Sequence, residues 1–184
     1  DLSRFDMRYS HAGVSLRASP NGPWSVRQLY YDCDERKPRL FDQGLSGFLV
    51  GTGDPSIGYV SVVLVPEAEA ALERAVQDNR RAMRLLGTTY SANAYAFAQR
   101  YQNCNQWVAE MLAAAWGAAT TREQAQAWLR AAAYEPTLFE VTSPLVAIGG
   151  AFVPWLRHDD HPPEDAQALR YRVTMPASIE AFIR

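Results

Sequence analysis

The sequence predicts one domain of the α+β class, in which strands and helices occupy largely separate stretches of the chain. Alternating residues over 7–31 indicate a β-hairpin, and a run of branched apolar residues over 57–65 indicates a buried strand. Several later segments have helical periodicity. The 184 residues, 48% hydrophobic and 21% charged, are enough for a single core. We therefore treat residues 1–184 as one domain.

The hairpin is predicted from two segments on either side of a turn. Residues 7–16 alternate in the manner of a strand, "SPNGP" contains turn-forming residues, and "WSVRQLYY" over 24–31 is rich in aromatic and branched residues. Residues 37–50 are mixed, and "LFDQGLSGFL" predicts a short helix or an irregular loop under the sheet. The run "IGYVSVVLV" over 57–65 predicts a buried strand that Pro66 ends.

A long surface helix is predicted after Pro66, which suits the first position of a helix. Its segment "EAEAALERAVQDNRRAMRLL" has acidic residues in the first turn and basic residues near its end, as the helix dipole favours. A second helix is predicted over 103–116. Thr120 or Thr121 is predicted to cap a third helix, "REQAQAWLRAAA".

The remaining segment, from Tyr134 onward, contains many Pro and Gly residues. It includes one predicted strand, "LRYRVTM", and a short last helix after Pro176.

Charge and hydropathy exclude some classes of partner. The formal net charge of −2 provides no positive field to attract nucleic acid or an anionic membrane surface. The apolar runs are shorter than the roughly 20 residues that cross a bilayer as a helix. We expect no nucleic-acid partner, no transmembrane segment and no cofactor.

Cys104 lies at the start of the second predicted helix and admits two interpretations. With Val108, Met111 and Ala115 it forms a face directed to the core, so it can be a small buried residue. The first turn of a helix also carries unpaired N–H groups and a positive dipole end, which stabilise a thiolate. The same position predicts a reactive thiol.

The amides near this thiol could also hold the oxyanion of a tetrahedral intermediate, with Gln102, Asn103 or Asn105 as further donors. The second cysteine, Cys33, stands in "YDCDER", where like-charge repulsion from the acidic neighbours would raise its pKa. Cys104 is therefore the better nucleophile.

A thiol nucleophile needs a base, and the chain has three histidines, His11, His158 and His161. His11 is predicted in mid-strand beside the small residues Ala12 and Gly13, which leave room for another element at the ring. The alternative is a strand histidine bonded to a backbone carbonyl. His11 is the preferred base, because His158 and His161 lie in a polar, Pro-rich segment.

Gln28 is the candidate for orienting His11. If the strands pair about Ser19 and Pro20, Gln28 lies opposite His11, and its amide oxygen can accept the second ring N–H. A shift of register would place Tyr30 or Trp24 there instead. The alternative for Gln28 is a solvated strand amide.

The segment "HDDH" over 158–161 raises the question of a metal site. Four consecutive loop residues rarely converge on one ion without ligands from elsewhere. We expect no metal, and favour a structural loop in which Asp160 or His161 fastens the Pro-rich segment.

Taken together, "SHAG" on an early strand, a polar residue on the next strand and "NC" opening a later helix resemble a known arrangement. They are similar to the circularly permuted branch of the NlpC-type papain-like superfamily, which includes the lecithin retinol acyltransferase-like enzymes. More narrowly, "RYSHAG", "YQNCNQW" and "DDHP" look like a bacterial family known only as a domain of unknown function, usually made with an export signal.

The resemblance implies a papain-like fold with the cysteine-bearing helix packed on an antiparallel sheet. It implies Cys104 as nucleophile, His11 as base and Gln28 at the third, polar position, where relatives often have histidine or an acid. The implied activity is a cysteine hydrolase or acyltransferase for amide or ester bonds, with a peptide, lipid or cell-wall substrate, in a periplasmic or secreted protein. Two alternatives stay open: a non-catalytic binding module that retains the groove, and a Cys33–Cys104 disulfide that silences the thiol.

Overall fold

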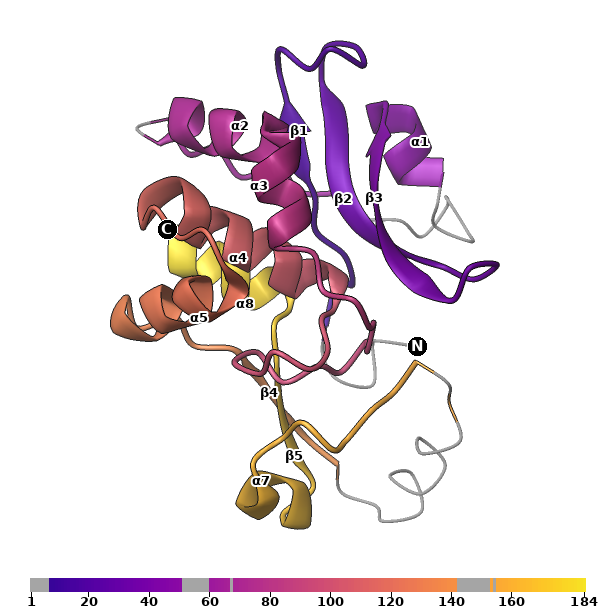
Figure 1. Ribbon diagram of the computed structural model, residues 1–184, viewed down its shortest axis with the longest axis vertical. Helices are drawn as coiled ribbons and strands as arrows, with labels where there is room; N and C mark the ends of the chain where they lie inside the picture. Colours follow the sequence, from indigo (N-terminus) through magenta and orange to yellow (C-terminus); the bar gives the residue numbers. More distant parts are fainter. Residues whose placement is uncertain (1–6, 51–59, 67, 142–152, 154) are drawn as a thin grey trace.

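The computed structural model describes residues 7–50, 60–66, 68–141, 153 and 155–184. Two antiparallel sheets lie toward opposite ends of the molecule (Figure 1). The first contains β1 (Val14–Leu16), β2 (Ser25–Asp32) and β3 (Lys37–Gln43) in that order, and the second pairs β4 (Thr137–Glu140) with β5 (Arg170–Val173). The predicted α+β class with antiparallel sheets is confirmed.

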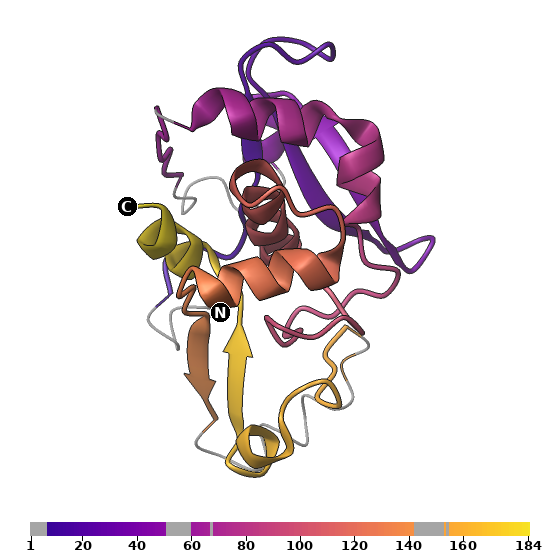
Figure 2. The same cartoon turned by 60° about the vertical axis from the view of Figure 1, so that its left-hand side comes forward.

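The helix α4 occupies the centre, and its residues from Cys104 to Ala114 are all buried. It packs against β2, α2 and α5, so it lies between the three-stranded sheet and the helices of the other half (Figures 1 and 2). The described helices are α1 (Leu45–Val50), α2 (Glu69–Gln77), α3 (Asn79–Arg84), α4 (Cys104–Trp116), α5 (Arg122–Ala131), α7 (Pro163–Gln167) and α8 (Pro176–Ile183). Within the described part of the chain, each of them is too short or too polar to span a lipid bilayer.

The second and third predicted helices are confirmed as α4 and α5. Asn103 caps α4, because its Oδ1 accepts the N–H of Gln106 at 2.7 Å. Thr121 caps α5, because its hydroxyl oxygen accepts the N–H of Gln124 at 3.2 Å. The late strand is observed as β5 and the last helix as α8.

The hairpin is confirmed, but its first strand is shorter and its register differs from the predicted one. Val14 pairs with Arg27, which shifts the pairing by two residues from a register that sets Gln28 opposite His11. Residues 7–13 precede β1 and belong to no strand. The physical reason is that backbone groups of Ser10 and Ala12 bond to the Asn105 side chain instead.

The prediction for residues 37–50 was half wrong. Residues 45–50 form the helix α1, but residues 37–43 form β3, which pairs with β2 along its whole length. The Arg27 guanidinium binds the Asp42 carboxylate at 2.6 Å across these two strands. This cross-strand ion pair stabilises a strand whose own residues lack the β-branched side chains typical of strands.

The long helix predicted after Pro66 is broken at Asp78, where the backbone is extended with ψ 96°. The Asp78 side chain accepts the N–H of Arg81 at 3.1 Å and so begins a second helix, α3. Aspartate favours this cap over a helix interior because its short side chain competes with the helical backbone bonds.

The strand predicted over 57–65 is wrong where the structure can test it, and residues 57–59 lie outside the described residues. Residues 60–65 belong to no described strand, and Val60, Val62 and Leu64 are 50%, 68% and 79% exposed. An apolar run forms a buried strand only beside a sheet that can pair with it.

A buried carboxylate joins α4 to its surroundings. Glu110 is fully buried and accepts hydrogen bonds from Arg122 at 2.9 Å, Gln102 at 2.7 Å and Gln126 at 2.9 Å. The Arg122 guanidinium also donates to the carbonyl oxygens of residues 98, 99 and 101. One ion pair therefore fastens both α5 and the segment that leads into α4.

Replacing Glu110 with alanine should destabilise the protein by about 3–5 kcal/mol, because it leaves the Arg122 guanidinium buried without a counter-charge. Urea unfolding followed by circular dichroism measures the loss. The matched control is Glu180→Gln, which breaks an ion pair at the partly exposed end of α8 and should cost under about 1 kcal/mol. Equal losses in the two variants would contradict the structural role of Glu110.

Candidate active site

Cys104 is the first residue of α4, directly after the cap residue Asn103. Asn103 is itself held in place, since its side-chain amide donates to the carbonyl oxygens of Ala92 and Thr174, each at 3.2 Å. The backbone N–H groups of Cys104 and Asn105 are directed at the sulfur atom. The sequence therefore places the thiol at the helix start, as predicted.

The thiol is nevertheless neutral in this structure. Burial raises the pKa of Cys104 to about 11, and this outweighs the opposing effects of the Tyr90 hydroxyl and the two backbone N–H groups. Burial disfavours the charged form of Cys104 by more than the helix start stabilises it, so the reactivity expected from its position stays a prediction. Burial also raises the pKa of Tyr90, which keeps its hydroxyl as a donor to the sulfur.

The His11 ring is held by Gln28. The distance between His11 Nε2 and Gln28 Oε1 is 2.5 Å, and the Gln28 amide nitrogen donates to Gln43 Oε1 at 2.8 Å. The bond to Gln43 turns the Gln28 oxygen toward the ring, so Nε2 carries the proton and Nδ1 is left as an acceptor. Burial lowers the pKa of His11, and the bond to Gln28 opposes that shift only in part.

Asn105 joins the histidine segment to the cysteine helix. Its Oδ1 accepts the N–H of Ala12 at 2.8 Å, and its Nδ2 donates to the carbonyl oxygen of Ser10 at 3.2 Å. One side-chain amide thus binds the backbone on both sides of His11, in the way that a neighbouring strand would. Gly13 lets this segment come close to β2, since a Cβ atom there would lie 2.6 Å from Val26 Cγ1.

Different aromatic rings lie beside the imidazole and beside the thiol. The His11 ring lies 5.8 Å from Tyr30, whereas Tyr90, which bonds the Cys104 sulfur, lies 5.2 Å from Tyr31. No hydrogen bond joins Cys104 to His11, both of which the structure describes, and their catalytic roles stay predictions.

The structure assigns the amides near the thiol to other tasks. Gln102 binds Glu110, Asn103 caps α4 and Asn105 binds the His11 segment, so the expected extra oxyanion donors are already engaged. The residues that sequence reasoning missed are Tyr90 and Gln43. Neither lies in a recognisable motif, and only the fold brings them to Cys104 and Gln28.

The "HDDH" segment has the structural role that the sequence favours. Asp160 Oδ2 accepts the N–H of Tyr95 at 2.9 Å, and His161 Nε2 donates to the carbonyl oxygen of Asn93 at 2.8 Å. These bonds fasten the segment to the chain that precedes Cys104. Across the described ranges, no three His, Cys, Asp or Glu side chains are grouped so that they could hold a metal ion.

Cys33 lies in the turn between β2 and β3 and is exposed, whereas Cys104 is buried. Both are free thiols. The Cys33–Cys104 disulfide considered above is therefore absent, and Cys33 contributes nothing to the site.

With this geometry established, the chain was compared with known proteins. Residues 1–183 match a family described as "Uncharacterized protein conserved in bacteria (DUF2145)". The chain belongs to this family. No curated protein and no solved structure matches it. The DUF2145 assignment agrees with the bacterial family of unknown function that the motifs resemble, and carries no link of its own to papain-like enzymes.

Replacing Gln28 with glutamate should raise the pKa of His11. In the native protein burial holds this pKa below its ordinary value of 6.5, so the ring is neutral at pH 7. A carboxylate beside Nε2 stabilises the imidazolium, and we expect protonation to move up by about one pH unit or more. NMR titration of the His11 ring measures the shift. Gln167→Glu, which adds the same charge on exposed α7, is the control and should leave His11 unchanged.

Alkylation by iodoacetamide should distinguish the two cysteines. With a pKa of about 11, roughly one Cys104 in a thousand is a thiolate at pH 8, and burial slows its reaction further. Cys33 should therefore react first, and the Cys104 rate should climb as the pH rises toward 11. Peptide mass spectrometry measures both rates. A Cys104 rate that is already maximal at pH 7 would contradict the neutral thiol.

Proposed function

We propose that this DUF2145 protein is a cysteine hydrolase or acyltransferase of the permuted papain-like kind, acting on amide or ester bonds. The observation that carries the proposal is the bond between His11 Nε2 and Gln28. It fixes the tautomer that a general base needs, because Nδ1 is left free to accept a proton in the neighbourhood of a cysteine at a helix start. The papain-like fold and the role of each residue belong to this proposal.

In the proposed reaction the sulfur of Cys104 attacks a carbonyl carbon while its proton passes to His11 Nδ1. The carbonyl π electrons move to oxygen, and the backbone N–H of Cys104 and the Tyr90 hydroxyl stabilise the oxyanion. The C–N or C–O bond then breaks, the leaving group takes the proton from His11, and a thioester remains on Cys104. Attack by water or by another acceptor releases the acyl group and restores the thiol.

Such a reaction requires the imidazole to approach the sulfur. Residues 7–13 lie outside the strand pairing, and the side chain of Asn105 links them to α4. A neutral thiol and a neutral imidazole suit this order of events. The positive charge on the imidazole and the negative charge on the substrate oxygen then form together, when the sulfur attacks the carbonyl. Gln28 orients the ring without balancing an imidazolium.

We place the proposed activity in the bacterial envelope, in a periplasmic or secreted protein. Support for this location, and for a peptide, lipid-linked acyl or cell-wall substrate, comes from the kinship of the motifs alone. Among these classes we favour peptide or amide bonds.

The alternative is a non-catalytic binding module that retains the same architecture. Complete burial of the Cys104 thiol, its raised pKa and the amide at position 28 favour this alternative. It predicts that Cys104→Ala leaves cellular function intact.

Acyl transfer to Cys104 should be detectable with a panel of p-nitrophenyl esters and cell-wall peptides. We expect the native protein to form a thioester on the Cys104 peptide, seen by mass spectrometry, and to turn over at least about 100-fold faster than His11→Ala. Cys33→Ala is the matched control and should behave like the native protein. Identical rates for the native protein, Cys104→Ala and His11→Ala would overturn the enzyme in favour of the binding module.

A further inference from the structure

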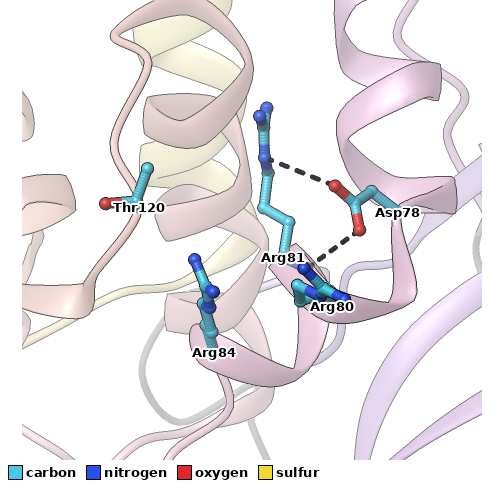
Figure 3. A pocket seen from close by; sticks show the side chains of 5 residues that line it. All are labelled: Asp78, Arg80, Arg81, Arg84 and Thr120. Atoms are coloured by element: carbon cyan, nitrogen blue, oxygen red, sulfur yellow. Dashed lines mark hydrogen bonds and ion pairs between the residues drawn. The ribbon is translucent and has the colours of Figure 1, made fainter.

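A hollow lies between α3 and the loop that joins α4 to α5. It is lined by Asp78, Arg80, Arg81, Arg84 and Thr120, and its cavity volume is about 80 Å³. Figure 3 shows Arg81 and Arg84 extending from α3 in the same direction, with Thr120 across the gap. The proposed chemistry at Cys104 uses none of these residues.

The lining is strongly basic although the chain carries a net charge of −2. The lining includes three arginines and one aspartate, which together carry a formal charge of +2. Asp78 is already engaged, because its side chain caps α3 and lies 4.0 Å from Arg81 Nε. The excess positive charge has no counter-charge within the lining.

The arginines have different surroundings. Arg81 has a structural contact, since its guanidinium donates to the carbonyl oxygen of Ala114 near the end of α4 at 3.4 Å. The side chains of Arg80 and Arg84 make no hydrogen bond or ion pair with any residue that the structure describes. They stand four residues apart on one helix, a spacing at which like charges repel. An anion between them would remove that repulsion.

We infer that this hollow binds a phosphate-type dianion, either free or as a phosphomonoester headgroup. The planar fork of a guanidinium matches two phosphate oxygens, and the charge of +2 matches a dianion. Thr120 shapes the opposite wall without donating, because both its N–H and its hydroxyl bond to Gln124 Oε1 at 2.9 Å. The binding bonds therefore come from the arginines.

Titration with inorganic phosphate near pH 8 tests the inference, with NMR detection of arginine Nε–H signals and sodium chloride at equal ionic strength as the reference. We expect saturable shifts in the native protein and at least about tenfold weaker binding in the double variant R80Q/R84Q. R17Q, which removes an exposed arginine of the β1–β2 loop, is the matched control and should bind like the native protein. No saturation in the native protein, or R80Q/R84Q within twofold of it, overturns the inference.

Sedimentation with vesicles separates the two sources of the phosphate. If the ligand is a headgroup, vesicles of phosphatidylcholine with phosphatidic acid will pellet the native protein and R17Q but not R80Q/R84Q. If only inorganic phosphate binds, the ligand is a soluble anion. Pelleting that R80Q/R84Q retains overturns the headgroup as a ligand of this hollow. Cys104→Ala should bind phosphate normally, so failure of the proposed enzyme leaves this result untouched.

Discussion

The buried pairing of Glu110 with Arg122 is the constraint on which the rest of the structure depends. The Glu110 carboxylate accepts a hydrogen bond from the Gln102 side chain. The same Gln102 side chain accepts the N–H of Gly87 and donates to the carbonyl oxygen of Leu85. The chain on both sides of Tyr90 is therefore anchored to one charge at the centre of α4. A buried charge is costly unless fully paired, so this anchor admits few alternative arrangements. It fixes Tyr90 and the start of α4 together.

The candidate site combines two neutral groups rather than a preformed ion pair. Burial shifts the pKa values of Cys104 and His11 in the directions that remove charge from both. Gln28 is consistent with this, since an amide orients an imidazole without the negative charge that would favour its protonation. The His11 ring is oriented instead by hydrogen-bonded side-chain amides, since Gln43 binds Gln28 and Gln28 binds His11. Asn105 supplies the second attachment of the same segment.

Local sequence signals predicted much of the fold. The features that they did not predict depend on contacts between residues far apart in the sequence. Caps such as Asn103 and Thr121 act within one helical turn, so the starts of α4 and α5 could be read from the sequence. The strand β3 depends on the ion pair of Asp42 with another strand, which no local pattern records. The contact between His11 and Gln28 was predicted from a strand register that differs from the observed one by two residues. The contact forms all the same, because the long glutamine side chain reaches an imidazole that lies outside the strand. Tyr90 reaches the thiol only through the folding of an aperiodic segment.

The exposed run from Val60 to Val65 has a consequence for handling the protein. Val60, Val62 and Leu64 lie largely in water, and burying each would gain part of the about 1.5–3 kcal/mol that full burial of an exposed apolar side chain contributes. Short, uncharged segments rich in β-branched residues are typical of amyloid-forming peptides, in which copies of one segment stack on one another. Pro66 ends the stretch and supplies no amide hydrogen to extend such a stack. Colloidal stability at high concentration thus depends on Val60, Val62 and Leu64, which the core leaves largely in water.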